Sequence, residues 1–144
     1  MSSSDAIGAT RAYFEGWNRH DVGAIVAAVG DGYVYDSDAN PGPVRGPDGV
    51  RAFAESFLGA FPDLAFEVDP VALGDDRVVA QWTVTGTHTG PLMGVPPSGR
   101  RFVLRGCDVT RAAGGRLVHT AAYWDSGALF RQLGAAPEGA PAGA

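Results

Sequence analysis

Three ionisable residues fall within two runs of alternating apolar and polar residues in the C-terminal half of the chain. Asp108 lies in the first run, and His119 and Asp125 lie in the second. Gly114-Gly115 joins the two runs, and this dipeptide tolerates the positive φ angles of a tight hairpin turn. A carboxylate on a strand that packs a core is paired, hydrated or functional. The predicted hairpin is therefore the first candidate region for proton-transfer chemistry.

The register of this hairpin decides which side chains face the core. If the Gly-Gly turn is a regular two-residue turn, Asp108 pairs with Ala121 and lies on the more apolar, concave face. Burial there raises the carboxyl pKa by desolvation, which suits proton transfer near neutral pH. Asp108 is thus the first catalytic candidate, and the alternative is a structural carboxylate held by a backbone amide or an Arg. The predicted inner set is Val78, Ala80, Trp82, Val84, His88, Phe102, Leu104, Gly106, Asp108, His119, Ala121, Tyr123 and Asp125.

Two further catalytic candidates depend on local geometry. A β-bulge in the last strand would turn Thr120, Ala122 and Trp124 inward instead, and Asp125 would then cap the final helix. His88 lies where a strand meets the Pro- and Gly-rich segment 89–99, so it could line the mouth of a pocket. The segment 89–99 itself is predicted to act as a mobile lid.

Elements that position these residues follow from the period of the apolar residues. The period is near 3.6 before Pro62 and changes to 2 after it, which predicts helices followed by a meander of long strands. This order predicts an α+β domain in which three helices cover a strongly curved, mainly antiparallel sheet. The predicted helices span 4–18, 22–29, 47–61 and 127–133, and the predicted strands span 33–38, 64–73, 77–88, 101–111 and 117–125. Gly30-Asp31-Gly32 is predicted to end the second helix.

Aromatic residues on these elements are core residues by default, but some must line any cavity that the concave face leaves. The substrate-binding candidates are Tyr13, Trp17, Tyr35, Phe57, Trp82, Met93 and Tyr123.

Composition excludes several classes of function. The net charge of −5 argues against a nucleic-acid partner, and no run is long enough to span a membrane. The N-terminus lacks the features of a signal peptide, so we expect a cytoplasmic protein. All eleven basic residues are Arg, which excludes lysine chemistry, and the single Cys107 excludes an internal disulfide and a thiolate zinc site. No cofactor motif or metal-ligand cluster is present. One domain is expected over residues 1–134, followed by a disordered tail over 135–144.

Several motifs resemble the SnoaL-like polyketide cyclase family. They are Gly86-Thr-His-Thr-Gly-Pro-Leu-Met-Gly-Val-Pro-Pro-Ser-Gly-Arg-Arg-Phe102, Asp108-Val-Thr-Arg111, and Leu129-Phe-Arg-Gln-Leu-Gly134, with helical segments such as Tyr13-Phe-Glu-Gly-Trp-Asn-Arg-His-Asp21. The resemblance implies a nuclear transport factor 2-like cone, usually an oligomer, with an apolar pocket between the helices and the sheet. It also implies cofactor-free acid/base chemistry on a hydrophobic, polyketide-derived molecule.

One departure from the family pattern reduces the number of reactions that the resemblance implies. In the aldol-type cyclases of the family, a His stands at the position of Asp108 and an essential Asp near the position of Ala122. The chain resembles more closely the branch that keeps an Asp on the inner strand, which includes cofactor-independent hydroxylases. We therefore predict a cyclase- or hydroxylase-type tailoring enzyme with Asp108 as base and acid, assembled as a homo-oligomer through the outer face of the sheet. The alternatives are an epoxide hydrolase, an ether-ring-forming or isomerase-type enzyme, a non-catalytic binding module, and a structural subunit whose pocket is filled by its own aromatic side chains.

Overall fold

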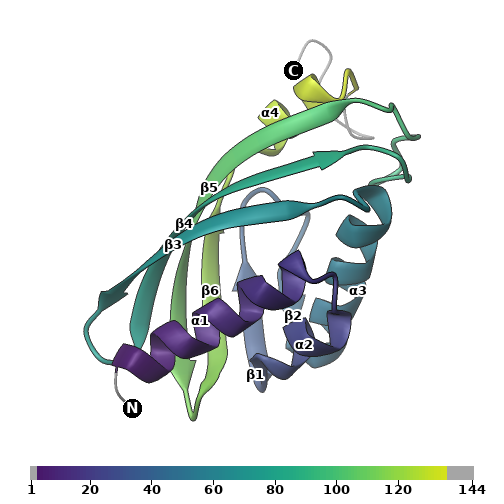
Figure 1. The fold of residues 1–144 in the computed structure, drawn as a ribbon. Helices are drawn as coiled ribbons and strands as arrows, with labels where there is room; N and C mark the ends of the chain where they lie inside the picture. The colour runs from purple at the N-terminus through teal and green to yellow at the C-terminus, as the bar shows by residue number, and fades with distance from the viewer. Residues whose placement is uncertain (1–2, 136–144) are drawn as a thin grey trace.

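The computed structural model describes residues 3–135. Six strands form one curved sheet in the order β2-β1-β6-β5-β4-β3, and every neighbouring pair is antiparallel except β1 with β6 (Figure 1). Helices α1, α2 and α3 lie on one side of this sheet, so the predicted α+β class is confirmed. In chain order the elements are α1 (Ser3–Asn18), α2 (Val22–Ala27), β1 (Val29–Asp36), β2 (Val44–Arg45), α3 (Gly46–Ala60), β3 (Ala65–Leu73), β4 (Arg77–Thr87), β5 (Arg101–Ala113), β6 (Arg116–Tyr123) and α4 (Ser126–Gln132).

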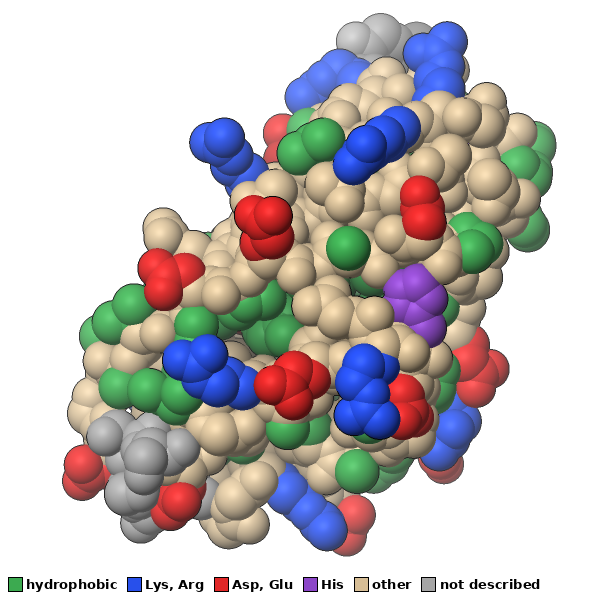
Figure 2. All heavy atoms as spheres, in the orientation of Figure 1, with side chains coloured by type: hydrophobic (Ala, Val, Ile, Leu, Met, Phe, Trp, Pro, Cys, Tyr) green, Lys and Arg blue, Asp and Glu red, His purple; other side chains and the backbone are tan. Residues whose placement is uncertain are grey.

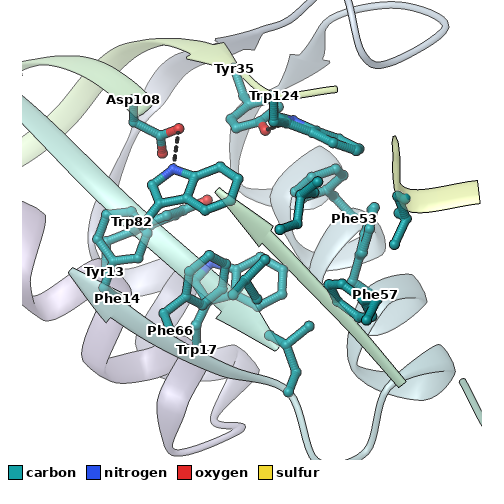
Figure 3. Close-up of a pocket in the computed structure, with 15 residues that line it drawn as sticks. Tyr13, Phe14, Trp17, Tyr35, Phe53, Phe57, Phe66, Trp82, Asp108 and Trp124 are labelled. Carbon is teal, nitrogen blue, oxygen red and sulfur yellow. Dashed lines mark hydrogen bonds between the residues drawn. The ribbon is translucent and has the colours of Figure 1, made fainter. Parts of the chain in front are cut away.

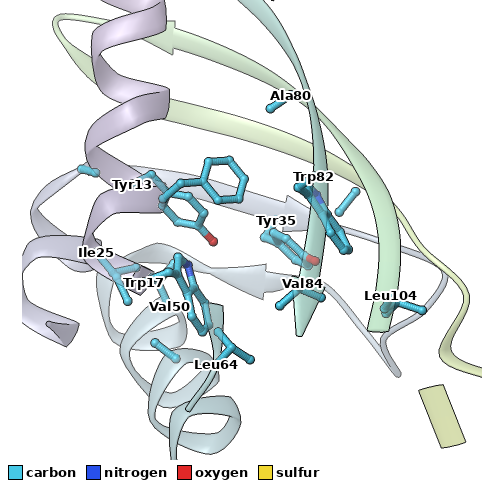
Figure 4. Close-up of a cluster of buried hydrophobic side chains, with 14 of the residues drawn as sticks. Tyr13, Trp17, Ile25, Tyr35, Val50, Leu64, Ala80, Trp82, Val84 and Leu104 are labelled. Atoms are coloured by element: carbon cyan, nitrogen blue, oxygen red, sulfur yellow. The ribbon is translucent and has the colours of Figure 1, made fainter. Parts of the chain in front are cut away.

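The core lies between the helices and the inner face of the sheet (Figure 4). Helix α1 contributes an aromatic face because Tyr13, Phe14 and Trp17 recur at helical spacing, and all three side chains are buried. The inner residues of β4 predicted from the alternating pattern are also buried, namely Val78, Ala80, Trp82 and Val84. Regular alternation along an antiparallel strand thus placed the central part of the core correctly.

Strand β1 begins earlier than the sequence predicts. Helix α2, whose Asp21 carboxylate accepts a hydrogen bond from the Ala24 amide at 3.0 Å, ends at Ala27. Gly30 and Gly32, expected to end that helix, instead lie within β1. The segment is extended because β1 pairs in parallel with β6 on both sides of it, at Val29 and from Val34 onward, and this pairing outweighs the low strand propensity of glycine.

The last strand contains a β-bulge. Ala112 pairs with Leu117, but Arg111 pairs with His119, so one residue of β6 has no partner on β5. The regular register was therefore wrong and the bulged alternative was correct. Leu117 and Ala122 differ in parity along the strand, and both are buried because the bulge changes the parity between them. Asp108 consequently pairs with Ala122 rather than with Ala121.

The segment 89–99 is packed against the body of the protein. The Thr89 and Gly90 amides donate hydrogen bonds to the Ala60 carbonyl at 3.0 and 3.1 Å, at the end of α3. Gly90 lies directly against the Gly59 carbonyl, where a Cβ atom would collide with it. The Leu92 and Val95 backbones exchange two hydrogen bonds, and both side chains are buried. This packing argues against the predicted mobile lid.

The C-terminal helix closes one end of the sheet. The Gln132 side chain donates to the Val103 carbonyl and accepts from the Val103 amide, both at 2.9 Å, where β5 extends beyond the end of β6. Of the predicted tail over 135–144, only Ala135 lies within the described residues, and its amide bonds to the Phe130 carbonyl. On the face drawn in Figure 2, acidic and basic side chains are interspersed, and no broad basic patch is present.

Candidate active site

An apolar pocket lies between the inner face of the sheet and helices α1, α3 and α4 (Figure 3). About 550 Å³ in and around the pocket is not filled by protein atoms, and this volume includes open solvent. Most of its wall is aromatic. The lining residues are Tyr13, Phe14, Trp17, Tyr35, Phe53, Phe57, Leu64, Phe66, Trp82, Val84, Phe102, Leu104, Asp108, Trp124 and Leu129.

Asp108 is the only acidic or basic residue among the described residues that line the pocket. Its side chain is 4% exposed, and Oδ1 accepts a hydrogen bond from the Trp82 Nε1–H at 3.0 Å. Within residues 3–135 no ion pair or second side-chain hydrogen bond reaches this carboxylate. Desolvation raises the pKa of Asp108 to about 7, and the Trp82 hydrogen bond opposes this rise. A carboxyl with this pKa can both accept and return a proton near neutral pH.

Gly106 explains how Trp82 reaches the carboxylate. The two residues are paired across β4 and β5, and the Trp82 indole lies directly over the Gly106 Cα. A Cβ atom on Gly106 would collide with the six-membered ring of the indole. The missing side chain therefore accommodates Trp82, which in turn orients Asp108.

Three buried tyrosines lie close enough to the carboxylate for its charge to act on them. Tyr13 and Tyr35 line the pocket, and burial together with the Asp108 charge raises the pKa of both above its usual value. The Tyr35 hydroxyl accepts a hydrogen bond from the Trp124 Nε1–H at 3.2 Å. Tyr33, behind the pocket, donates to the Thr120 Oγ1 at 2.7 Å. These hydroxyls remain protonated at neutral pH. Tyr33 gives its hydrogen to Thr120, so Tyr13 and Tyr35 are the two that can donate to a ligand in the pocket.

Five of the seven predicted substrate-binding residues line the pocket, namely Tyr13, Trp17, Tyr35, Phe57 and Trp82. Tyr123 was misplaced because the β-bulge turns it to the outer face, where it is 63% exposed. Met93 lies at the exposed tip of the segment 89–99 with a φ of 49° and does not line the pocket.

Asp125 lies outside the pocket. Its carboxylate accepts a hydrogen bond from the Ala128 amide at 3.0 Å and thereby caps α4. It also forms an exposed ion pair with Arg131 at 3.6 Å. The helix-capping alternative is confirmed, and the prediction that Asp125 shares the inner face with Asp108 was wrong.

His88 faces inward as predicted, but it does not line the pocket. The ring is fully buried and packs against Phe61, with ring centroids 5.6 Å apart. Its Nδ1 accepts a hydrogen bond from the Ser98 backbone amide at 3.1 Å and lies 3.0 Å from the Ser98 Oγ. Because Nδ1 is an acceptor, the neutral ring carries its proton on Nε2, which has no hydrogen-bond partner within residues 3–135. His88 therefore holds the end of the segment 89–99 on the sheet.

Replacing His88 by Phe is expected to loosen this attachment. Phe keeps the packing on Phe61 but removes the acceptor for the Ser98 amide, a hydrogen bond worth about 1 kcal/mol. Hydrogen exchange of the Ser98 amide should accelerate by up to about tenfold, while exchange within β4 stays unchanged. Ser98→Ala is the control, because it removes the hydroxyl and retains the bond from the amide to Nδ1. Equal exchange at Ser98 in wild type and His88→Phe would contradict the assignment.

Some lining residues were not among the predictions. Phe53 lies one helical turn from Phe57 on α3, and this spacing alone could have indicated it. Phe66 faces inward by the alternation of β3. Trp124 was expected to face inward only in the bulged register, which is the register observed.

No group of three or more His, Cys, Asp or Glu side chains within residues 3–135 could hold a metal ion. Among the same residues, no helix is long and apolar enough to cross a membrane.

A curved sheet whose inner face is covered by helices, with an apolar pocket between the two layers, is the arrangement of a nuclear transport factor 2-like fold. A solved protein of that fold from Burkholderia pseudomallei superposes with a TM-score of 0.76 at 22% identity, over 94% of this chain and 100% of that chain. The chain belongs to the SnoaL-like polyketide cyclase family, whose model matches residues 7–133. The predicted cone and the family resemblance are thereby confirmed.

Two solved structures from Streptomyces are more similar in sequence. AclR from Streptomyces galilaeus, for which a hydroxylase function has been suggested, is 32% identical with a TM-score of 0.80, over 98% of this chain and 87% of that chain. IdmH from Streptomyces antibioticus, for which a polyketide cyclase function has been suggested, is 27% identical with a TM-score of 0.74, over 93% and 99% of the two chains. No curated protein matches the chain.

Proposed function

We propose that this protein is a tailoring enzyme that uses Asp108, without a cofactor, to move a proton on a hydrophobic, polyketide-derived small molecule. The observation that carries the proposal is a single carboxylate, with a pKa of about 7, in an otherwise apolar pocket. Family membership and the similarity to AclR and IdmH support a hydroxylase- or cyclase-type reaction.

The ionised carboxylate suits the removal of a proton from a carbon next to a carbonyl group. The proton passes to Asp108, and the electrons of the broken C–H bond delocalise onto the carbonyl oxygen as an enolate. The protonated carboxyl can then return the proton to the product. Formation of such an anion is a first step open to ring closure. It is also open to hydroxylation when dioxygen is the oxidant and an external two-electron reductant converts the second oxygen atom to water.

An aldol reaction that needs a second carboxylate beside the first has little support. Ala122 pairs with Asp108 across β5 and β6 and is itself buried. Its methyl group occupies the place where a second inward-facing acid would stand, so one carboxylate must act as both base and acid. Tyr13, Trp17, Tyr35, Phe57 and Trp82 would contact the substrate.

Asp108→Asn tests the proposal directly. Asn keeps the shape of the side chain and the acceptor for Trp82 but cannot take a proton, so proton transfer should slow by about 10² to 10⁴-fold. Incubation of the protein with a panel of aromatic polyketide ketones in D₂O, followed by mass spectrometry, measures exchange of the acidic C–H. For wild type, the rate should rise with pH and level off above about 7, the pKa of the base.

Asp125→Asn is the matched control, because Asn is an equally good helix cap and this residue lies outside the pocket. It should exchange the same ketones at the wild-type rate. Undiminished exchange by Asp108→Asn would show that Asp108 is not the base. Exchange that wild type does not accelerate above the rate without protein would favour a binding module.

We also propose that the protein forms a homo-oligomer through the outer face of the sheet. The support is the apolar surface exposed there by Val71, Val103 and Tyr123, which are 53%, 52% and 63% exposed. Sedimentation equilibrium would measure the size of the assembly.

A further inference from the structure

The pocket contains few polar atoms, and most of them are already hydrogen-bonded within the protein. The Trp82 N–H is used by Asp108 and the Trp124 N–H by Tyr35. The Tyr33 hydroxyl donates its hydrogen to the Thr120 Oγ1. Near Asp108, a ligand can therefore find the second carboxylate oxygen and the hydroxyl hydrogens of Tyr13 and Tyr35, and of these two hydroxyls it is that of Tyr35 that Trp124 orients by a hydrogen bond.

The Tyr35 hydroxyl is oriented to donate. Its oxygen accepts from Trp124, and no acceptor for its own hydrogen is present within residues 3–135. The ring is held by burial at 6% exposure and by a tilted contact with Phe53, with centroids 5.0 Å apart. A buried hydroxyl hydrogen without an acceptor is costly, and a ligand oxygen in the pocket would remove that cost.

Tyr35 and Asp108 reach the pocket from strands on either side of β6. Tyr35 is paired with Thr120 on that strand, and Asp108 is paired with Ala122 two residues further on. Both side chains line the same pocket, from the two sides of β6 (Figure 3). Burial raises the pKa of Tyr35 well above its usual value, and the Asp108 charge adds to this rise. One molecule can thus contact the hydroxyl and the carboxylate together.

We infer that Tyr35 donates a hydrogen bond to a carbonyl oxygen of the substrate, the oxygen that gains negative charge when Asp108 removes the neighbouring proton. The catalytic role of this hydrogen bond rests on the proposed function. The hydrogen bond from Tyr35 to a carbonyl ligand does not depend on it. It defines the substrate class as a flat, uncharged aromatic ketone or enol whose acidic C–H is adjacent to that oxygen. Trp124 is a positioning residue, because its N–H occupies the Tyr35 lone pair and directs the hydroxyl hydrogen into the pocket.

The test uses two probes of equal shape, 2-acetylnaphthalene and 2-isopropenylnaphthalene. Only the ketone can accept a hydrogen bond. Calorimetric titration of the full chain should show that wild type binds the ketone about five- to tenfold more tightly than the alkene. Tyr35→Phe should abolish this preference and leave the affinity for the alkene unchanged. Trp124→Phe keeps an aromatic ring and should reduce the preference about twofold.

Two results would overturn the inference. One is equal binding of the two probes to wild type, including no binding of either. The other is a parallel loss of affinity for both probes in Tyr35→Phe, which would assign Tyr35 a packing role. Repeating the titration in Asp108→Asn separates the inference from the proposed function. Suppose that Asp108→Asn still prefers the ketone and still exchanges the ketone panel at the full rate. The assignment of Tyr35 as the donor would then hold, and the assignment of Asp108 as the base would be wrong.

Discussion

Replacing Asp108 by Asn is expected to stabilise the folded protein by about 4 kcal/mol at pH 8, and by nothing measurable below pH 4. The pKa of this carboxyl rises from 3.8 to about 7 on folding, chiefly because burial penalises the charged form. A tenfold difference in acidity between the folded and unfolded states corresponds to about 1.4 kcal/mol, so the figure is an upper value for the cost of ionising Asp108 in the fold.

The direction of the stability change follows from the pH at which the unfolded chain loses its proton. Below pH 4 the carboxyl is protonated in both states, and its contribution to stability is fully present. Between pH 4 and 7 the unfolded chain ionises while the folded protein holds its proton, so the free energy of unfolding falls as pH rises. Above about pH 7 both states are ionised and the loss is complete. Asn carries no charge at any of these pH values, so the free energy of unfolding of Asp108→Asn does not fall for this reason.

Urea unfolding at several pH values between 4 and 8 measures the effect. Wild type should lose stability across this window relative to Asp108→Asn, with most of the difference present by pH 7. Asp36→Asn, an exposed carboxylate at the end of β1, is the control and should follow the wild-type curve. Parallel curves for wild type and Asp108→Asn would mean that the carboxyl is hydrated in the folded protein. A variant that gains stability and loses turnover would mark Asp108 as a residue retained for chemistry.

Gly106→Ala is expected to cost about 1 to 3 kcal/mol, as overpacking of a filled core does. The added methyl group would overlap the Trp82 indole, which cannot move away without leaving Asp108. Because the Trp82 hydrogen bond lowers the pKa of Asp108, its loss should raise that pKa further above 7. Titration of the Asp108 carboxyl carbon by NMR reads this change separately from stability.

Gly8→Ala provides the matched control for this substitution. Gly8 is exposed on α1, and no atom lies within 4 Å of where its Cβ would stand. Alanine there should stabilise the protein by about 0.5 to 1 kcal/mol through helix propensity. If Gly106→Ala behaves like Gly8→Ala, the indole is free to move, and the orienting role of Gly106 is wrong.

The inner faces of β4 and β5 could be predicted from the sequence, and that of β6 could not. Trp82 and Asp108 lie on regularly paired antiparallel strands, where alternation alone determines which face each residue occupies. On β6, Ala121 and Ala122 are the same residue type, so side chains give no sign of which one faces inward. The bulge that decides between them lies nearer the turn, and it is set by pairing with two neighbouring strands at once.

The segment 89–99 shows a second limit of the sequence. Its Pro and Gly residues are typical of a mobile loop, but its backbone amides bond to Ala60 and its end is held by His88. Ala60 is about thirty residues away along the chain, and a local sequence pattern cannot predict a hydrogen bond between segments so far apart. Met93, which belongs to this segment, was predicted to bind substrate but does not line the pocket.

All three tryptophans of the chain, Trp17, Trp82 and Trp124, line one cavity. The intrinsic emission of the protein therefore comes almost entirely from the candidate site, with no distant indole to dilute the signal. A ligand that enters the pocket must alter the polarity or quenching around at least one of them. The protein thus carries its own optical reporter, and unlabelled natural products can be screened against it by fluorescence before any reaction is known.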